Sequence, residues 1–203
     1  MQLYRTPFSR AYWADALADF RKVRSLVFSA LMVAACVALS YIPSIPVADG
    51  VRVTWGFLAR ALCGLVCGPV NALVFGFVED TVSFFMNPGG AYFPGYALTT
   101  MLGTMTYALF LYRSRVTVLR VVLAKLITNI QNVLLGSLWN AILLSKGYYY
   151  YMTKSAVKNA IMFPVQTIML VMLFAALIPI LSRMGLLPNE MGQRLYLRRR
   201  KAQ

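Results

Sequence analysis

Long apolar segments recur along this chain, and they constrain its fold more than any other feature. A membrane hydrocarbon core about 30 Å thick needs about 20 predominantly apolar residues in a helix, and stretches such as 94–112 and 155–181 are that long or longer. Hydrophobic residues make up 60% of the chain, and the mean hydropathy is +0.65. This leaves too little polar surface for a soluble domain. We therefore predict an all-α integral membrane protein.

The apolar segments predict a bundle of six transmembrane helices in one domain, residues 23–182. A cytoplasmic segment, 1–22, precedes this domain, and a basic cytoplasmic tail, 183–203, follows it. The expected helices are 23–41, 53–67, 70–86, 94–112, 117–144 and 155–181. Pro43 and Pro46 end the first helix, and Gly68 and Pro69 make a tight turn between the second and third. The second and third are short for a full span, so five or seven helices remain alternatives.

The basic residues predict the orientation of the bundle. The net charge is +14, and the lysines and arginines gather mainly at residues 5–24, 113–120 and 183–201. With six spans these three segments lie on one side, which is the cytoplasm by the positive-inside rule. We expect both termini inside (N-in/C-in). A distribution between apolar spans indicates membrane topology and no nucleic-acid partner.

Three loops on the opposite, outer side carry aromatic residues and cations: 43–52, 87–93 and 145–154. The segment "NPGGAYFPGYALTT" (87–100) holds Tyr92, Phe93 and Tyr96 among glycines and prolines, and the last loop has tyrosines at 148–151. Tyrosines at a membrane surface are often an interfacial belt. The alternative is a lid over a binding site for a flat anionic molecule, and three such loops on one face favour it.

Charged residues inside spans are costly and need a partner or a function. Arg60 lies in the second predicted helix, and Glu79 and Asp80 lie at matching depth in the third. Arg60 can pair with one carboxylate across the turn, which is the structural interpretation. The other carboxylate is then free to bind a ligand, and we expect Asp80 to accept two parallel hydrogen bonds from an amidine-like edge.

Other polar residues lie at the depth of the predicted lid. They are Trp139, Asn140, Lys158 and Asn159. Ligand binding and helix packing remain equal alternatives for them, whereas Asn129, Gln131 and Gln166 are interpreted as contacts between helices.

The chain offers no catalytic machinery. It has no histidine and no GxxxxGK[ST], GxSxG or HExxH motif. Cys36, Cys63 and Cys67 lie within predicted spans, which argues against a disulfide or a zinc site. We expect no catalytic residue, no metal and no cofactor, and a binding protein that depends on an external motor. Ala30, Ala34 and Ala38 recur every four residues and would allow close approach of another helix, from a partner or from the same bundle.

The run from Val53 to Arg113 resembles the substrate-binding S-components of energy-coupling factor (ECF) vitamin transporters, with the folate-specific branch most similar. The resemblance rests on the turn from Gly56 to Pro69, an acidic residue in the third helix, and the loop "GGAYFPGYAL", with Ala97 where threonine is usual. The segments "SLWNAILLSKGYYY" and "VKNAIMFPVQ" extend it to the sixth helix.

This resemblance implies the six-helix S-component fold, with a ligand site near the outer face of a bacterial cell membrane. It also implies partners: a transmembrane coupling subunit (EcfT), which would contact Ala30, Ala34 and Ala38, and two ATPase subunits, which would use the ATP. The leading hypothesis is capture of folate or a reduced folate and its delivery inward.

Specific residues would carry that function. Asp80 would bind the pterin edge, while Tyr92, Phe93, Tyr96 and Trp139 would stack on the rings. Arg52, Lys154 and Lys158 would attract the glutamate carboxylates. The alternatives are an S-component for another flat heterocycle, such as a thiamine or queuosine precursor, and a structural membrane protein without a transport role.

Overall fold

The computed structural model describes residues 3–4, 6–7, 9–42, 45–48, 51–53, 55–86, 92–143 and 147–188, and for 45–48 and 51–53 it describes the backbone alone. The elements, in chain order, are α1 (Arg10–Phe20), α2 (Val23–Ser40), β1 (Ile45–Ala48), β2 (Val51–Val53), α3 (Phe57–Met86), α4 (Pro94–Leu111), α5 (Val118–Leu143) and α6 (Tyr148–Arg183). The predicted all-α membrane bundle is confirmed, with one short hairpin added.

Helix α3 consists of two arms that fold back on each other. Gly68 interrupts it with φ 81° and ψ 175°, and Pro69 follows. Arg60 and Glu79 would be about 28 Å apart in a straight helix, yet their side chains are joined by hydrogen bonds of 3.0 and 3.1 Å. The two arms, 57–67 and 69–86, therefore correspond to the second and third predicted helices.

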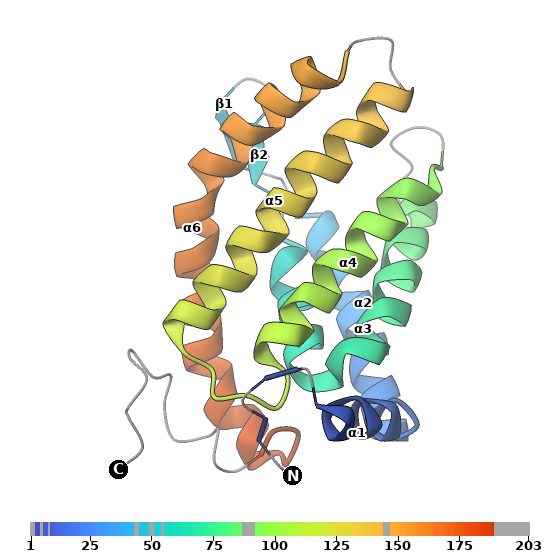
Figure 1. Ribbon diagram of the computed structural model, residues 1–203, viewed down its shortest axis with the longest axis vertical. Coiled ribbons are helices and arrows are strands. Elements are labelled where there is room, and N and C mark those ends of the chain that lie inside the picture. Colours follow the sequence, from blue (N-terminus) through green and yellow to red (C-terminus); the bar gives the residue numbers. More distant parts are fainter. Residues whose placement is uncertain are drawn as a thin grey trace.

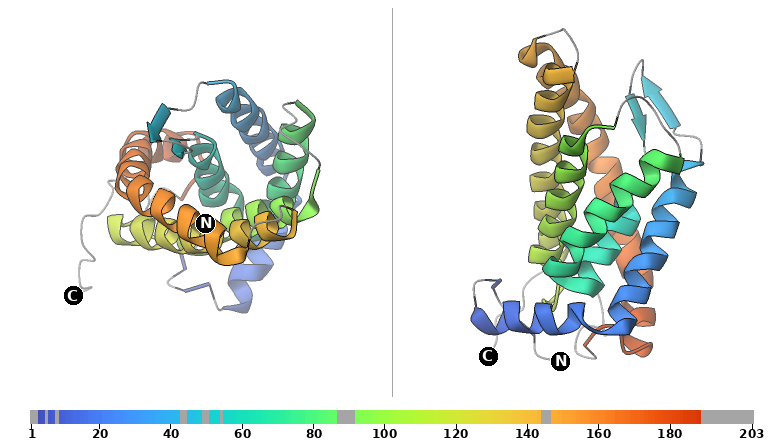
Figure 2. Two further views of the ribbon diagram at one scale, coloured as in Figure 1. Left: turned by 90° about the horizontal axis from the view of Figure 1, so that it is seen from above. Right: turned by 90° about the vertical axis from the view of Figure 1, so that its right-hand side faces the viewer.

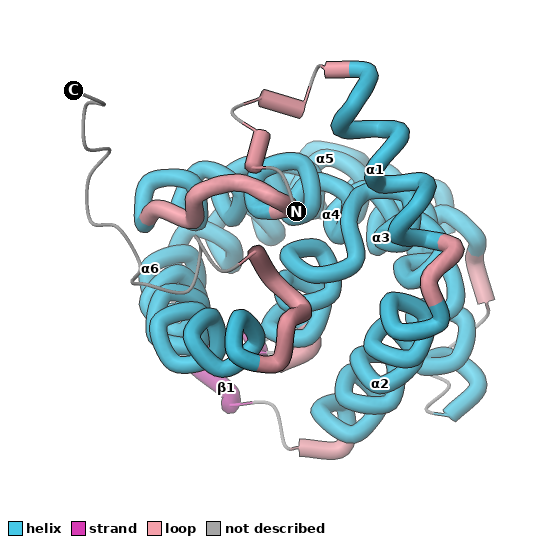
Figure 3. The backbone as a smooth tube through the Cα atoms, turned by 90° about the horizontal axis from the view of Figure 1, so that it is seen from below, coloured by secondary structure: helices cyan, strands magenta, loops and turns pink. Residues whose placement is uncertain are grey.

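The helices run along the long axis of the molecule, and α1 lies across one end (Figures 1 and 2). The C-terminal end of α6 reaches the same end, as the view from below in Figure 3 shows. The bundle consists of α2, the two arms of α3, α4, α5 and α6. Four helices, α2, α3, α5 and α6, are long and apolar enough to span a membrane. Helix α4 has 18 residues but contains four threonines.

Two apolar cores hold the bundle together. In the larger one, Leu65 of the first α3 arm packs with Tyr107 of α4 and Phe174 of α6, and all three side chains are almost fully buried. In the smaller one, Cys36 of α2 packs with Cys63 and Phe75 of α3. The first arm of α3 contributes to both, which explains why it is surrounded by the other helices (Figure 2).

Helix α1 is fastened to the end of the bundle by polar contacts. The Tyr12 hydroxyl donates to the Ala108 carbonyl at 3.3 Å. Arg113 donates to Asp15 and, at 2.8 Å, to Asp19, which also accepts from Tyr112 at 2.5 Å. Residues 10–20 were expected only as part of a cytoplasmic segment, and they form a docked helix.

The starts of two helices differ from the prediction by several residues. The second helix was expected from Val53 but begins at Phe57, because Val53 pairs with Ile45 in the antiparallel hairpin. The sixth was expected from Ser155, yet α6 begins at Tyr148, so Tyr148–Tyr151 form its first turn. Most of the predicted basic tail, residues 189–203, lies outside the described residues. The orientation relative to the membrane stays a prediction.

Candidate functional site

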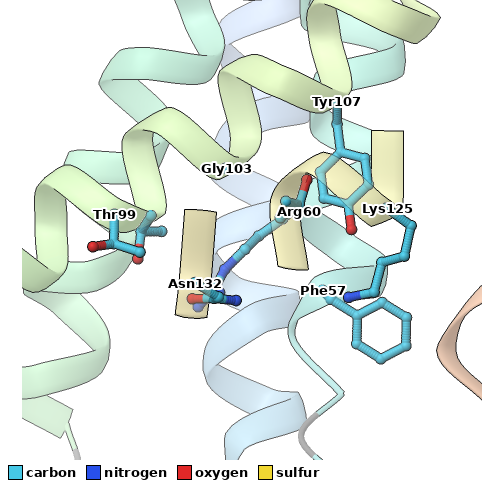
Figure 4. Close-up of a pocket in the computed structure, with 9 residues that line it drawn as sticks. Phe57, Arg60, Thr99, Gly103, Tyr107, Lys125 and Asn132 are labelled. Atoms are coloured by element: carbon cyan, nitrogen blue, oxygen red, sulfur yellow. The ribbon is translucent and has the colours of Figure 1, made fainter. Parts of the chain in front are cut away.

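A cavity of about 40 Å³ lies inside the bundle between the first arm of α3, α4 and α5 (Figure 4). Its lining residues are Phe57, Arg60, Thr99, Thr100, Gly103, Tyr107, Lys125, Thr128 and Asn132. Such a volume holds a few water molecules. A vitamin-sized ring therefore fits only after the surrounding side chains move.

Arg60 forms the predicted ion pair, and its partner is Glu79. The guanidinium donates from Nε and from one terminal nitrogen to the two carboxylate oxygens, at 3.1 and 3.0 Å. This bidentate geometry is the strong form of the interaction. The Glu79 side chain is only 4% exposed, whereas Arg60 is 33% exposed where it lines the cavity. The pair joins the two arms of α3 beside the cavity.

Asp80 is the carboxylate that remains outside this pair. It is partly buried and accepts one hydrogen bond, from the Thr100 hydroxyl at 3.3 Å. Within the described part of the chain it accepts no other. Thr100 lines the cavity, so it connects Asp80 to that space. Asp80 thus retains capacity to accept hydrogen bonds from a ligand edge.

Three predicted aromatic residues gather near the Thr99 side of the cavity. Phe93 packs against Tyr96 and Trp139, with ring centroids 6.1 and 5.5 Å apart. The Trp139 indole donates to Thr99 at 2.9 Å, and the Tyr96 hydroxyl donates to Asn140 at 2.9 Å. The structure therefore brings the predicted residues of α4 and α5 together.

Gly95 allows this aromatic cluster to pack tightly. A Cβ atom at that position would lie 2.4 Å from a Phe93 ring atom and 2.7 Å from a Trp139 ring atom. The close approach explains one glycine of the loop "GGAYFPG". The preceding residues 87–91 lie outside the described part of the chain.

Other predicted site residues lie away from the cavity. The Tyr92 ring packs on Phe84, 5.2 Å between centroids, and its hydroxyl lies 3.1 Å from that of Thr81. Asn159 donates to Ser155 within α6. Lys158 does not line the cavity, and the side chain of Arg52, on β2, is outside the described atoms.

Sequence reasoning missed most of the residues that line the cavity, among them a lysine and a tyrosine that are almost fully buried. Lys125 of α5 is 3% exposed, and Tyr107 of α4 is 1% exposed. Lys125 carried a usable signal, since it is a charge within a predicted span and such residues are functional candidates. Tyr107 carried none, because an aromatic residue in a membrane helix ordinarily packs against lipid or other helices.

The arrangement can bind a polar, flat molecule, and two further observations describe its surroundings. Among the described residues, no group of three or more histidine, cysteine, aspartate or glutamate side chains could hold a metal ion. On the outside of the bundle, Ala30, Ala34 and Ala38 are all exposed on α2. Internal packing therefore does not account for this stripe.

Comparison with known proteins places this geometry in context. Residues 24–187 match a family model described as "ECF transporter, substrate-specific component". The folate transporter FolT of Clostridium novyi (strain NT) is 32% identical over 151 residues, which is 74% of this chain and 87% of that protein. A crystal structure of FolT bound with folic acid has a TM-score of 0.63 at 26% identity, covering 72% of this chain and 88% of its own.

Proposed function

The chain belongs to the family of ECF transporter substrate-specific components, and from this premise we propose that it captures folate, or a reduced folate, from outside the cell. Members of this family are transport subunits and not enzymes. In the proposal, folate binds within the bundle near the outer membrane face and is then delivered inward. The cell would be bacterial, and the membrane its plasma membrane.

One observation carries the folate assignment. The chain is similar over most of its length to FolT, both to the curated protein and to a structure solved with folic acid. The geometry supports a ligand of this kind, because a partly buried carboxylate and an aromatic cluster flank one internal cavity.

Individual residues receive roles in this proposal. Asp80 accepts hydrogen bonds from the amino-pyrimidine edge of the pterin, which presents two parallel donors. Phe93, Tyr96 and Trp139 stack on the rings, and each contributes on the order of 1 kcal/mol. Tyr92 would join them only if its ring left Phe84.

The charged tail of the ligand is drawn in by cations at the outer end. Arg52, Lys154 and Lys158 attract the glutamate carboxylates in this proposal, and Asn140 and Asn159 supply neighbouring amide groups. Attraction between exposed charges is screened by salt. Association of folate should therefore slow as ionic strength rises.

The energy for transport comes from partner subunits in this proposal. A transmembrane coupling subunit contacts the exposed stripe of Ala30, Ala34 and Ala38, and two ATPase subunits hydrolyse the ATP. The chain itself needs no cofactor. Small residues exposed on an apolar helix support this contact, because they let another helix approach closely.

Equilibrium binding tests the proposed function. The purified protein in detergent is titrated with folate, thiamine, pantothenate and riboflavin, and binding is followed by tryptophan fluorescence. We expect sub-micromolar affinity for folate alone. Sub-micromolar affinity for another vitamin with none for folate would overturn the substrate, and indifference to all four would favour a structural role.

A further inference from the structure

Lys125 is a buried lysine that has no counter-ion among the residues that the structure describes. Its side chain belongs to α5, about 10 Å along the helix from Val118, and the residue is 3% exposed. Its Nζ lies 4.8 Å from the centroid of the Phe57 ring. Within the described part of the chain it forms no hydrogen bond and no ion pair.

The acidic residues of the described chain have other partners. Asp15 and Asp19 lie on α1 at the end of the bundle and bind Arg113. Glu79 binds Arg60, and Asp80 accepts from Thr100. A cation–π contact returns only part of the free energy that burial of an ammonium costs. Among the residues that the structure describes, nothing else compensates Lys125.

A second buried polar group shares the same end of the cavity. The Tyr107 hydroxyl lies near Thr128 and makes no hydrogen bond of normal geometry. Figure 4 shows Lys125, Phe57 and Tyr107 together on one side, Thr99 on the other, and Arg60 and Asn132 between them. An ammonium and a hydroxyl thus offer donors at one end, while Thr100 connects the other end to the carboxylate of Asp80.

We propose that Lys125 binds an acceptor oxygen of the ligand at the end of the cavity beside Phe57, with Tyr107 next to it. The inference rests on the proposed function and deepens it. Asp80 holds the donor edge of the ligand, and Lys125 compensates a negative or partly negative oxygen some distance away. Because a carboxylate acts at one end of the cavity and an ammonium at the other, the ligand is held in one of its two possible directions.

Folate offers this oxygen from three sources, which are the 4-oxo group of the pteridine, the carbonyl of the p-aminobenzoyl amide and the glutamate carboxylates. Aminopterin carries an amino group in place of the 4-oxo group, and folic acid dimethyl ester has both carboxylates masked. Aminopterin also lacks the N3–H donor of the edge proposed for Asp80, so the effect of each analogue is read as the ratio of its affinities for the wild-type protein and the Lys125 variant.

The test compares Lys125→Met with the wild-type protein, both as full chains in detergent. A hydrogen bond from a charged donor is worth about 10- to 100-fold in affinity, so we expect folic acid binding to weaken by that factor. The apparent melting temperature should stay unchanged or rise, because an uncompensated charge has been removed.

Lys125→Arg should retain part of the affinity. Lys22→Met, which removes an exposed lysine at the far end of the bundle, is the control and should bind normally.

The analogues identify the oxygen. If Lys125→Met no longer weakens binding of aminopterin, the oxygen is the 4-oxo group; if it no longer weakens binding of the dimethyl ester, the oxygen is a carboxylate. If it weakens binding of both analogues as it does that of folic acid, the oxygen is the amide carbonyl. The inference alone is overturned if Lys125→Met and the wild-type protein bind folic acid with equal affinity. It is also overturned if Lys125→Met loses affinity and its melting temperature falls as well, because the lost affinity then reflects a damaged fold. A wild-type protein that binds no folic acid overturns the proposed function, and the inference falls with it.

Discussion

Charged side chains inside the bundle are accommodated in three different ways. Within the described part of the chain, Arg60 and Glu79 neutralise each other, Asp80 is held by a single hydroxyl, and Lys125 lies against an aromatic ring. A completed pair stabilises the connection between the two arms of α3. The incomplete groups are the ones available to a ligand, because each still has unused hydrogen-bonding capacity.

Removal of either member of the Arg60–Glu79 pair should destabilise the protein unequally. Arg60→Met leaves a 4% exposed carboxylate without its ion-pair partner, with a hydrogen bond of 3.4 Å from Ser83 remaining, and should cost about 3 kcal/mol. Glu79→Gln should cost less, because the substituted amide keeps an oxygen that can accept a hydrogen bond from the guanidinium. Thermal unfolding in detergent measures both. The double variant Arg60→Met/Glu79→Met should recover stability, and equal losses in the two single variants would contradict the asymmetry.

Helix α3 and helix α1 show how single elements set the shape of the site. The reversal at Gly68 brings Arg60 and Glu79 together from positions 19 residues apart. Helix α1 covers the end of the bundle at which this reversal lies, and Tyr12, Ala16 and Asp19 are buried there against α3 and α4. The turn at Gly68 and helix α1 lie away from the cavity, but both hold the helices that line it in place.

Gly68→Ala should lower the melting temperature strongly. Its φ of 81° with ψ of 175° is open almost only to glycine, and a Cβ there would lie 3.0 Å from ring atoms of Tyr112. Strain of this kind costs about 2 kcal/mol. Gly136→Ala on α5 is the matched control, since no atom lies within 4 Å of the added Cβ. The control should be neutral or stabilised, and equal effects in both variants would refute the explanation.

Low pH should detach helix α1 from the end of the bundle. Burial alone would raise the pKa of Asp19, but hydrogen bonds from Lys22, Tyr112 and Arg113 outweigh it and lower the pKa below its ordinary 3.8. A carboxylate with a lowered pKa stabilises the folded state fully above pH of about 4, and this contribution disappears as the pH falls through the lowered value. Hydrogen-exchange protection factors of residues 10–20, taken relative to the intrinsic rate at each pH, should fall in that range. Asp19→Asn should show fast exchange at every pH; protection like that of the wild type would disprove the role.

The complete molecule combines an enclosed site with an exposed apolar helix. Helix α2 packs one side on α3 through Cys36, and only 11% of it is buried. The alanine stripe lies on its exposed surface. Binding and assembly therefore use different faces of the bundle, and substitutions should separate them.

Ala34→Trp should leave folate affinity unchanged and abolish assembly with the coupling subunit. The bulky ring projects from an exposed position, so it keeps a partner helix away without disturbing the cavity. Co-purification with the coupling and ATPase subunits measures assembly. Leu126→Trp, at an exposed position on α5, is the control and should assemble. Normal assembly of Ala34→Trp would exclude the stripe as the contact.

Local signals in the amino-acid chain were sufficient for the membrane helices, the turn at Gly68 and Pro69, and the pairing of Arg60 with a nearby carboxylate. These features depend on apolar length, on backbone conformations open to glycine, and on residues at equal depth in adjacent helices. The convergence of Phe93, Tyr96 and Trp139 also followed, because the loop and the end of α5 lie on one side of the membrane.

Contacts between distant segments were beyond such signals. The burial of Lys125 against Phe57, the packing of Tyr92 on Phe84 and the docking of α1 through Arg113 depend on which helix faces meet. A helix that is apolar all round gives no amphipathic stripe to orient it, since lipid and protein neighbours are equally apolar. The rotation of each helix, and with it the lining of the cavity, is therefore settled by packing in three dimensions.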